Sequence, residues 1–140
     1  MFHKLLVAHD GSEGAEKAFL AALDMAVVCQ AELHTISIIE VHSHFAATMG
    51  EVTEEREEDR KLYERVIEKA RRIASDRGIS LHAEILTGHE VETIIHYLRE
   101  NRYDLLVVGF MGHSKVFGRI WGGTSQNLTK VSPCSVLVMK

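Results

Sequence analysis

The sequence predicts an α/β domain built on a parallel sheet, and three observations lead to this fold class. Short β-branched and Leu-rich runs alternate with segments whose apolar residues recur at helical spacing. Strands that alternate with helices form right-handed βαβ units, which place the strands parallel in one sheet. The length of 140 residues and the 46% hydrophobic content suit one core, and no linker or repeat divides the chain. We therefore expect a single domain over residues 1–140.

Five strands and four helices are expected in alternation. The strands, recognised by β-branched and Leu-rich runs, are residues 3–9, 32–40, 80–86, 104–108 and 135–139. The helices are recognised by apolar residues three or four positions apart, which lie within 15–29, 62–74 and 91–98, and a short last helix is expected from Thr124 to Val131. The stripe at 62–74 marks the inner face of a long second helix, which opens with the acidic block from Glu51 to Asp59. A loop is expected at about 41–50, before the long second helix. Ser12 can cap the first helix, Gly78 can end the second, and Pro133 stops the fourth.

The glycines that follow the fourth strand carry most of the functional information. Gly109 and Gly112 come after the apolar run 105–108, and Gly122, Gly123 and Thr124 follow after nine intervening residues. Glycines at the carboxyl end of a buried strand let the backbone approach a ligand closely. Several amide groups can then converge on one anion, and the start of a helix adds its positive dipole end. The pattern favours a phosphate chain as the ligand.

This spacing resembles the G-x2-G-x9-G-(S/T) loop of the ATP-binding branch of the universal stress protein family. The opening Lys4-Leu-Leu-Val-Ala-His-Asp10-Gly-Ser12 is similar to the first strand and Asp-Gly-Ser turn of that family. The closing Ser132-Pro-Cys-Ser-Val-Leu-Val-Met139 is similar to its last strand. These landmarks occur in the right order, so the resemblance covers essentially the whole chain.

The resemblance implies an open five-stranded parallel sheet, doubly wound and Rossmann-like, with strand order 3-2-1-4-5 and helices on both faces. Ligands of such sheets bind outside the carboxyl ends of the strands where the strand order reverses, which here lies between the first and fourth strands. The resemblance also implies an adenine nucleotide, ATP with Mg²⁺ or Mn²⁺ carried on its phosphates, and a role as a nucleotide-dependent sensor or regulator in the stress response.

The residues expected at the nucleotide are Ala8, His9, Asp10, Ile38, Val108, Gly109, Gly112, His113, Gly122, Gly123, Thr124 and Ser125. By the resemblance, Asp10 accepts a hydrogen bond from the adenine or ribose side, and the amides of the later glycines hold the phosphates. The hydroxyls of Thr124 and Ser125 are additional donors there. Ala8, His9, Ile38 and Val108 are expected to line the base pocket. A protonated His113 near a phosphate would make binding depend on pH.

Two features leave alternatives open. The family places Ser or Thr directly after the third glycine of the loop, and this chain has Gly123 there, with the hydroxyls of Thr124 and Ser125 displaced by one position. A nucleotide-independent, dimeric interaction module that keeps the glycines for folding is therefore one alternative. Asp10 can equally serve only its own turn and the start of the first helix, a geometry that Asp favours.

An enzyme is the other alternative, either a slow ATPase or a phosphotransferase on the same fold. The chain has no G-x4-G-K-(S/T) loop, no G-x-S-x-G elbow and no Cys–His nucleophile pattern, so we name no catalytic residue. Phosphoryl transfer depends mainly on positioning and charge, which leaves slow hydrolysis open. His42 and His44 are the only close histidine pair, and nearby residues do not complete a metal site.

The distribution of charge restricts the classes of ligand that the protein is expected to bind. Residues 105–140 contain four Lys and Arg and no acidic residue, although the net charge of the chain is −4. A positive end in an acidic chain suits a small polyanion. The chain has no basic stripe with interleaved aromatics, the pattern that would indicate nucleic-acid binding.

No apolar stretch approaches the ~20 residues that cross a bilayer, and we expect a cytoplasmic protein. The apolar strand 135–139 would lie at a sheet edge, where pairing with a second copy would produce a homodimer.

Overall fold

The computed structural model describes residues 1–41, 49–110 and 123–140. Within these residues the strands are β1 (Lys4–Ala8), β2 (Glu32–Glu40), β3 (Leu81–Gly88), β4 (Leu105–Gly109) and β5 (Ser135–Met139). The helices are α1 (Glu13–Cys29), α2 (Met49–Asp76), α3 (Glu90–Asn101) and α4 (Gly123–Val131). The predicted alternation is confirmed. The strand ends differ from the expected ones by at most two residues, the largest difference being that β3 continues to Gly88, and α2 begins at Met49, two residues before the acidic block that was expected to open it.

All strand pairs are parallel, and the strand order is β3-β2-β1-β4-β5. This confirms the open, doubly wound sheet with order 3-2-1-4-5. β1 lies at the centre, where residues 4–8 pair with 32–36 of β2 and residues 5–7 pair with 105–107 of β4. The strand order therefore reverses at β1, between β2 and β4.

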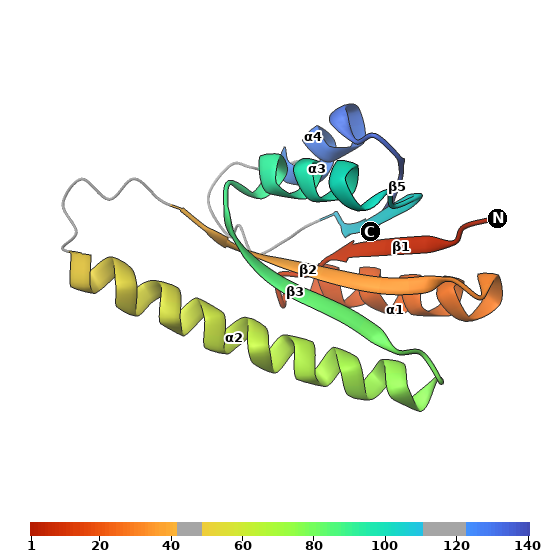
Figure 1. The fold of residues 1–140 in the computed structure, drawn as a ribbon, viewed down its shortest axis with the longest axis horizontal. Helices are drawn as coiled ribbons and strands as arrows, with labels where there is room; N and C mark the ends of the chain where they lie inside the picture. Colours follow the sequence, from red (N-terminus) through yellow and green to blue (C-terminus); the bar gives the residue numbers. More distant parts are fainter. Residues whose placement is uncertain (42–48, 111–122) are drawn as a thin grey trace.

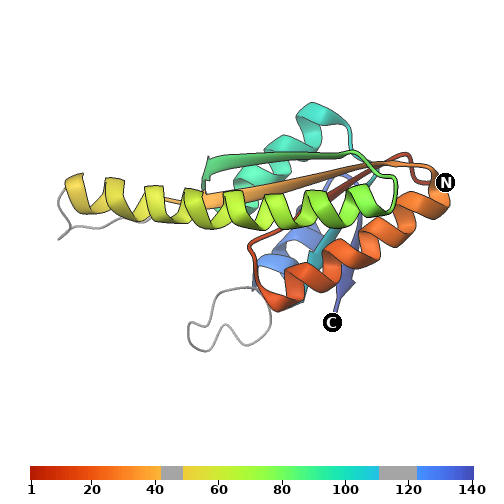
Figure 2. The same ribbon diagram turned by 90° about the horizontal axis from the view of Figure 1, so that it is seen from below.

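Helices cover both faces of the sheet (Figures 1 and 2). On one face, α1 and α2 bury a cluster that includes Phe19, Leu23, Leu33 and Ala74. On the other face, α3 and α4 bury a cluster that includes Leu6, Ile94 and Leu128. Because alternate residues of a strand point to opposite faces, each central strand contributes to both clusters.

The helix boundaries follow from local chemistry. The Ser12 hydroxyl accepts a hydrogen bond from the Ala15 amide and so caps α1, as predicted. After α2, Gly78 has a φ of +76°, and the amide of Ile79 donates to the carbonyl of Ala74. A left-handed glycine with such a bond is a common helix terminus, which confirms the predicted end of α2.

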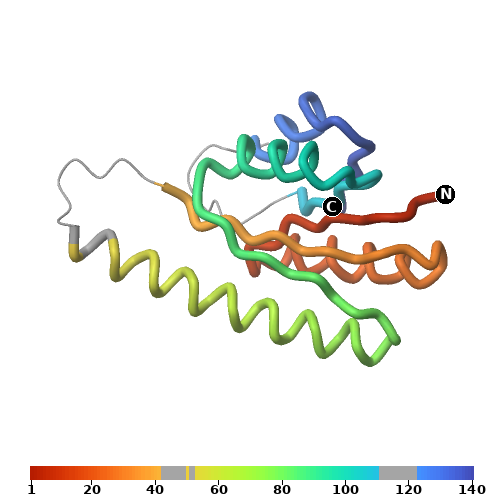
Figure 3. The backbone as a smooth tube through the Cα atoms, viewed as in Figure 1, coloured from red at the N-terminus to blue at the C-terminus, as the bar shows by residue number. Residues whose placement is uncertain are grey.

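The amino-terminal part of α2 extends beyond the sheet, as the tube in Figure 3 shows. Residues 53–58 of this part are exposed, whereas Ile67, Ala70 and Ala74 farther along pack against the core. Within the described residues, every helix is too short or too polar to cross a bilayer.

Candidate functional site

The carboxyl ends of β1 and β4 lie side by side, and this is where the predicted site residues come together. Asp10 is the second residue after β1, and Gly109 is the last residue of β4. The Ser125 hydroxyl, buried in the first turn of α4, donates to the carbonyl oxygen of Phe110 at 3.5 Å. The amino end of α4 therefore lies against the end of β4.

The turn after β1 is held by two side chains that accept from backbone amides. Asp10 Oδ1 accepts from the Ser12 amide at 2.9 Å, and His9 Nδ1 accepts from the Gly11 amide at 3.1 Å. Gly11 has a φ of +80°, which favours glycine. Asp10 thus serves the turn, as the structural alternative predicted. The turn uses one carboxylate oxygen of Asp10. The role of Asp10 at a nucleotide stays a prediction.

Gly109 has a packing role that the sequence did not reveal. A Cβ atom added at Gly109 would lie 2.5 Å from the carbonyl carbon of Gly14 and 2.9 Å from the amide nitrogen of Ala15. The missing side chain therefore lets the first turn of α1 pack directly on the end of β4. This contact is sufficient to explain Gly109 without a ligand.

His9 is buried, with 7% of its surface exposed, and its ring packs near Phe19 of α1 with the centroids 5.9 Å apart. Burial lowers the pKa of His9, although the carboxylates of Asp10 and Glu16 oppose this shift. Since Nδ1 accepts from an amide, the proton of the neutral ring is on Nε2.

The four residues predicted to line a base pocket divide between the two faces of the sheet. Ile38 and Val108 are buried, and Ala8 half-buried, in the cluster covered by α3 and α4. His9 instead faces α1 on the opposite side. The structure thus groups Ala8, Ile38 and Val108 and turns His9 away from them.

The loop residues divide between described and undescribed parts of the chain. Gly112, His113 and Gly122 lie outside the described residues. Gly123 and Thr124 are half-buried at the start of α4, and a Cβ atom added at Gly123 would meet nothing within 4 Å. The described residues therefore give no steric reason for glycine at position 123.

Tyr63 of α2 is a site neighbour that the sequence did not single out. Burial raises the pKa of its hydroxyl, and the negative charges of Asp10, Asp59, Glu90 and Glu40 raise it further. These carboxylates come from the ends of β1 and β2 and from two helices, so the β1–β2 side of the site is acidic. The only sequence signal was that Tyr63 adjoins the apolar stripe of its helix.

The fold is that of a doubly wound α/β protein. Its candidate ligand site lies at the carboxyl ends of β1 and β4, where the strand order reverses. The model of the universal stress protein family matches residues 1–140, and the chain belongs to this family. "Universal stress protein YxiE" of Bacillus subtilis is 30% identical over 151 residues, which cover all of both chains.

Solved structures agree on the fold. "Universal stress protein UspA from Lactobacillus plantarum" has a TM-score of 0.92 at 23% identity, covering 99% of this chain and 98% of that chain. A universal stress protein in complex with cAMP has a TM-score of 0.75 at 23% identity, covering 99% and 97%. An Arabidopsis thaliana family member with AMP bound has a TM-score of 0.67 at 20% identity, covering 99% and 91%.

Proposed function

We propose that this protein binds an adenine nucleotide at the carboxyl ends of β1 and β4 and acts as a nucleotide-dependent sensor or regulator in the stress response. The observation that carries the proposal is the position of the amino end of α4 against the end of β4, beside the turn after β1. Family members that bind cAMP and AMP support the choice of adenine.

The charge distribution suggests how the nucleotide lies. The phosphates would go to the α4 side, where the helix dipole is positive and residues 105–140 contain no carboxylate. The base and ribose would go to the acidic β1–β2 side, where carboxylates can accept hydrogen bonds from amino and hydroxyl groups. Under the proposal the ligand is ATP, with Mg²⁺ or Mn²⁺ held by its phosphates.

Gly123 gives the sharpest test of this proposal. Because a side chain fits at position 123, Gly123→Ser restores the hydroxyl that the family has there without a clash. We expect this variant to bind Mg-ATP more tightly by about three- to tenfold, since one added hydrogen bond contributes about 1 kcal/mol.

Isothermal titration of the nucleotide-stripped protein with Mg-ATP, AMP, cAMP and GTP is the measurement. Gly123→Ala is the matched control, because it adds a side chain without a hydroxyl. Gly122→Val should abolish binding. The absence of binding by the unmodified chain and by Gly123→Ser would reject the proposal.

The second candidate function is a nucleotide-independent interaction module, and the contact between Gly109 and α1 favours it. That contact explains one glycine of the pattern through folding alone. We also propose, for either function, that β5 pairs with its own copy in a homodimer. Ser135 is exposed and residues 136–139 are only half-buried at this sheet edge.

A further inference from the structure

Lys140 lies at the carboxyl edge of the sheet, beside the end of β4. The amide of Phe110 donates to the carbonyl oxygen of Met139 at 2.8 Å, which continues the pairing of β4 with β5 by one residue. The Nζ atom of Lys140 lies 5.3 Å from the centre of the Phe110 ring. A cation at this distance is attracted by the aromatic ring, so Phe110 holds the ammonium group of Lys140 at the end of β4.

Phe110 also contacts the first turn of α4, the side of the candidate site to which the phosphates are assigned. Val108 and Val138 pack in the cluster covered by α3 and α4. Phe110 and Lys140 follow them by two residues, and alternation along an extended chain gives such residues the same face. The carbonyl oxygen of Phe110 accepts from the Ser125 hydroxyl of α4 at 3.5 Å. Phe110 therefore contacts both the amino end of α4 and the ammonium group of Lys140.

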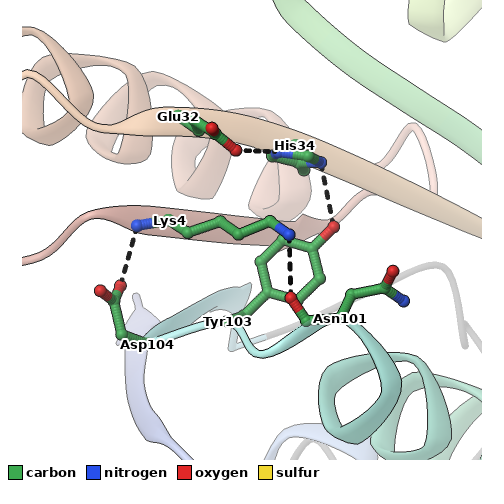
Figure 4. Close-up of polar contacts among 6 residues, drawn as sticks. All are labelled: Lys4, Glu32, His34, Asn101, Tyr103 and Asp104. Carbon is green, nitrogen blue, oxygen red and sulfur yellow. Dashed lines mark hydrogen bonds and ion pairs between the residues drawn. The ribbon is translucent and has the colours of Figure 1, made fainter.

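Another lysine, Lys4, makes the same kind of aromatic contact at the opposite edge of the sheet (Figure 4). Its Nζ atom lies 4.6 Å from the centre of the Tyr103 ring and also donates to the carbonyl oxygen of Asn101 at 2.8 Å. The contacts continue to His34, whose Nδ1 lies 3.0 Å from the Tyr103 hydroxyl and whose Nε2 lies 3.1 Å from Glu32 Oε2. The ammonium group of Lys4 thus has an acceptor within the fold and a structural role.

Lys140 has the aromatic contact without such an acceptor. Among the described residues, no hydrogen bond or ion pair occupies its ammonium group, and residues 105–140 contain no Asp or Glu. Lys130, the other lysine that the structure describes in this segment, lies in the last turn of α4, at the opposite end of that helix. The charge of Lys140 is therefore available to an anion at the carboxyl edge.

The order of the strands determines which part of a nucleotide Lys140 can reach. Under the proposed function the base and ribose lie on the β1–β2 side, and the phosphates extend toward α4. β5 lies beyond β4, two strands from β1 and about 10 Å away at the usual spacing of neighbouring strands. The phosphate attached to the ribose stays near β1 and β4, whereas the end of a triphosphate can approach β5.

We propose that Lys140 binds the terminal phosphates of the nucleotide and makes the site prefer a nucleoside triphosphate to a monophosphate. This inference rests on the proposed function. A lysine ammonium group presents three donors on a flexible four-carbon stem, and hydrogen bonds from a charged donor to phosphate are about twice as strong as neutral ones. AMP lacks the phosphates that reach β5, so Lys140 contributes to the binding of ATP and little to that of AMP.

Calorimetric titrations of Lys140→Met with Mg-ATP and with AMP test this proposal. Methionine keeps an apolar stem beside the Phe110 ring and removes the charge. We expect the affinity for Mg-ATP to fall about three- to tenfold and that for AMP to change less than about twofold, the effect of one charge-assisted hydrogen bond at an exposed position. The difference should shrink as the ionic strength rises, because salt screens exposed charges.

Two control variants separate the charge at this position from charge in general. Lys140→Arg retains the charge and should retain the preference for Mg-ATP. Lys130→Met makes the same change at the other end of α4 and should leave both affinities unchanged.

Phe110→Leu tests the aromatic contact as the feature that positions Lys140. It should weaken the binding of Mg-ATP by the unmodified chain and have little further effect in Lys140→Met, because the ring acts through the lysine. Additive losses in the double variant would contradict this positioning.

The outcomes distinguish a failure of this inference from a failure of the proposed function. Equal affinity for Mg-ATP in the unmodified protein and in Lys140→Met would overturn the inference and leave the proposed function intact. Equal losses for Mg-ATP and AMP would also overturn it, because AMP has no terminal phosphates. The absence of binding by the unmodified chain and by Gly123→Ser would reject the proposed function, and this inference with it.

Discussion

At the scale of single residues, Gly109 sets how closely β4 approaches α1. In Gly109→Ala, the new Cβ atom would lie 2.5 Å from the carbonyl carbon of Gly14, which is backbone and cannot rotate away. We expect Gly109→Ala to lower the free energy of unfolding by about 1–3 kcal/mol, the usual range for overpacking. Urea unfolding followed by circular dichroism measures this change.

Gly123→Ala is the matched control for this prediction. It adds the same methyl group where nothing lies within 4 Å, at the start of a helix. Alanine has a higher helix propensity than glycine, so this variant should be as stable as the unmodified protein or slightly more stable. A Gly109→Ala protein as stable as Gly123→Ala would contradict the packing role of Gly109.

His9 gives a prediction for the pH dependence of stability. Burial lowers its pKa below the value of about 6.5 that it has in the unfolded chain. As the pH falls below 6.5, the unfolded state binds a proton before the folded state does, and the free energy of unfolding decreases. The decrease stops at the folded pKa, and one histidine contributes at most about 1.4 kcal/mol per pH unit.

Urea unfolding between pH 7.5 and 5 measures this slope. His9→Asn retains an acceptor near the position of Nδ1 for the Gly11 amide and does not titrate, so its slope should be smaller than that of the unmodified protein. His96 is exposed on α3, and His96→Asn serves as the control. An equal slope in all three proteins would contradict the prediction.

The residue scale also shows why the candidate site was only partly predictable. A glycine at the end of a strand can leave room either for a ligand or for a closely packed helix. The sequence does not distinguish these two roles, because the contact of Gly109 with Gly14 joins positions far apart in the chain. The contacts of His34 with Glu32 and Tyr103 were missed because Tyr103 comes from a separate segment. The available signal was the alternation of Glu32 with His34, which places both on one face of their strand.

At the scale of elements, apolar periodicity predicted those parts of the chain that touch the core. The helical stripe of α1 corresponds to residues that are almost fully buried, including Ala18, Phe19 and Ala22. The amino-terminal part of α2 has no apolar stripe, and its residues 53–58 are exposed where the helix extends beyond the sheet. Its start was predicted instead from the acidic block that begins at Glu51, because carboxylates favour the amino end of a helix.

Among the described residues, two ion pairs connect α1 with α2 and with Arg77 directly after it. Lys69 Nζ lies 2.7 Å from Glu16 Oε1, and Arg77 Nη1 lies 2.9 Å from Asp24 Oδ1. All four side chains are largely exposed, so each pair contributes only about 0–1 kcal/mol. The two helices are held mainly by the apolar cluster beneath them.

At the scale of the whole molecule, the two edges of the sheet differ. β3 is flanked by α2 and carries the exposed charged side chain of Glu84, features that protect an edge strand. β5 has no internal charge or proline, and its apolar residues 136–139 are half-buried. An apolar edge strand without charge or proline can pair with another strand. A second copy of β5, related by a two-fold axis, can be that strand.

Val138→Glu tests this pairing, because the two-fold axis would bring both new carboxylates into one interface. We expect the unmodified protein to sediment as a dimer at micromolar concentration and Val138→Glu to sediment as a monomer. Val41→Glu makes the same change beyond β2, away from β5, and should leave the dimer intact. Circular dichroism establishes that each variant is folded. If Val138→Glu fails to fold, a dilution series of the unmodified protein decides alone. A monomer at every concentration would show that β5 stays unpaired in solution.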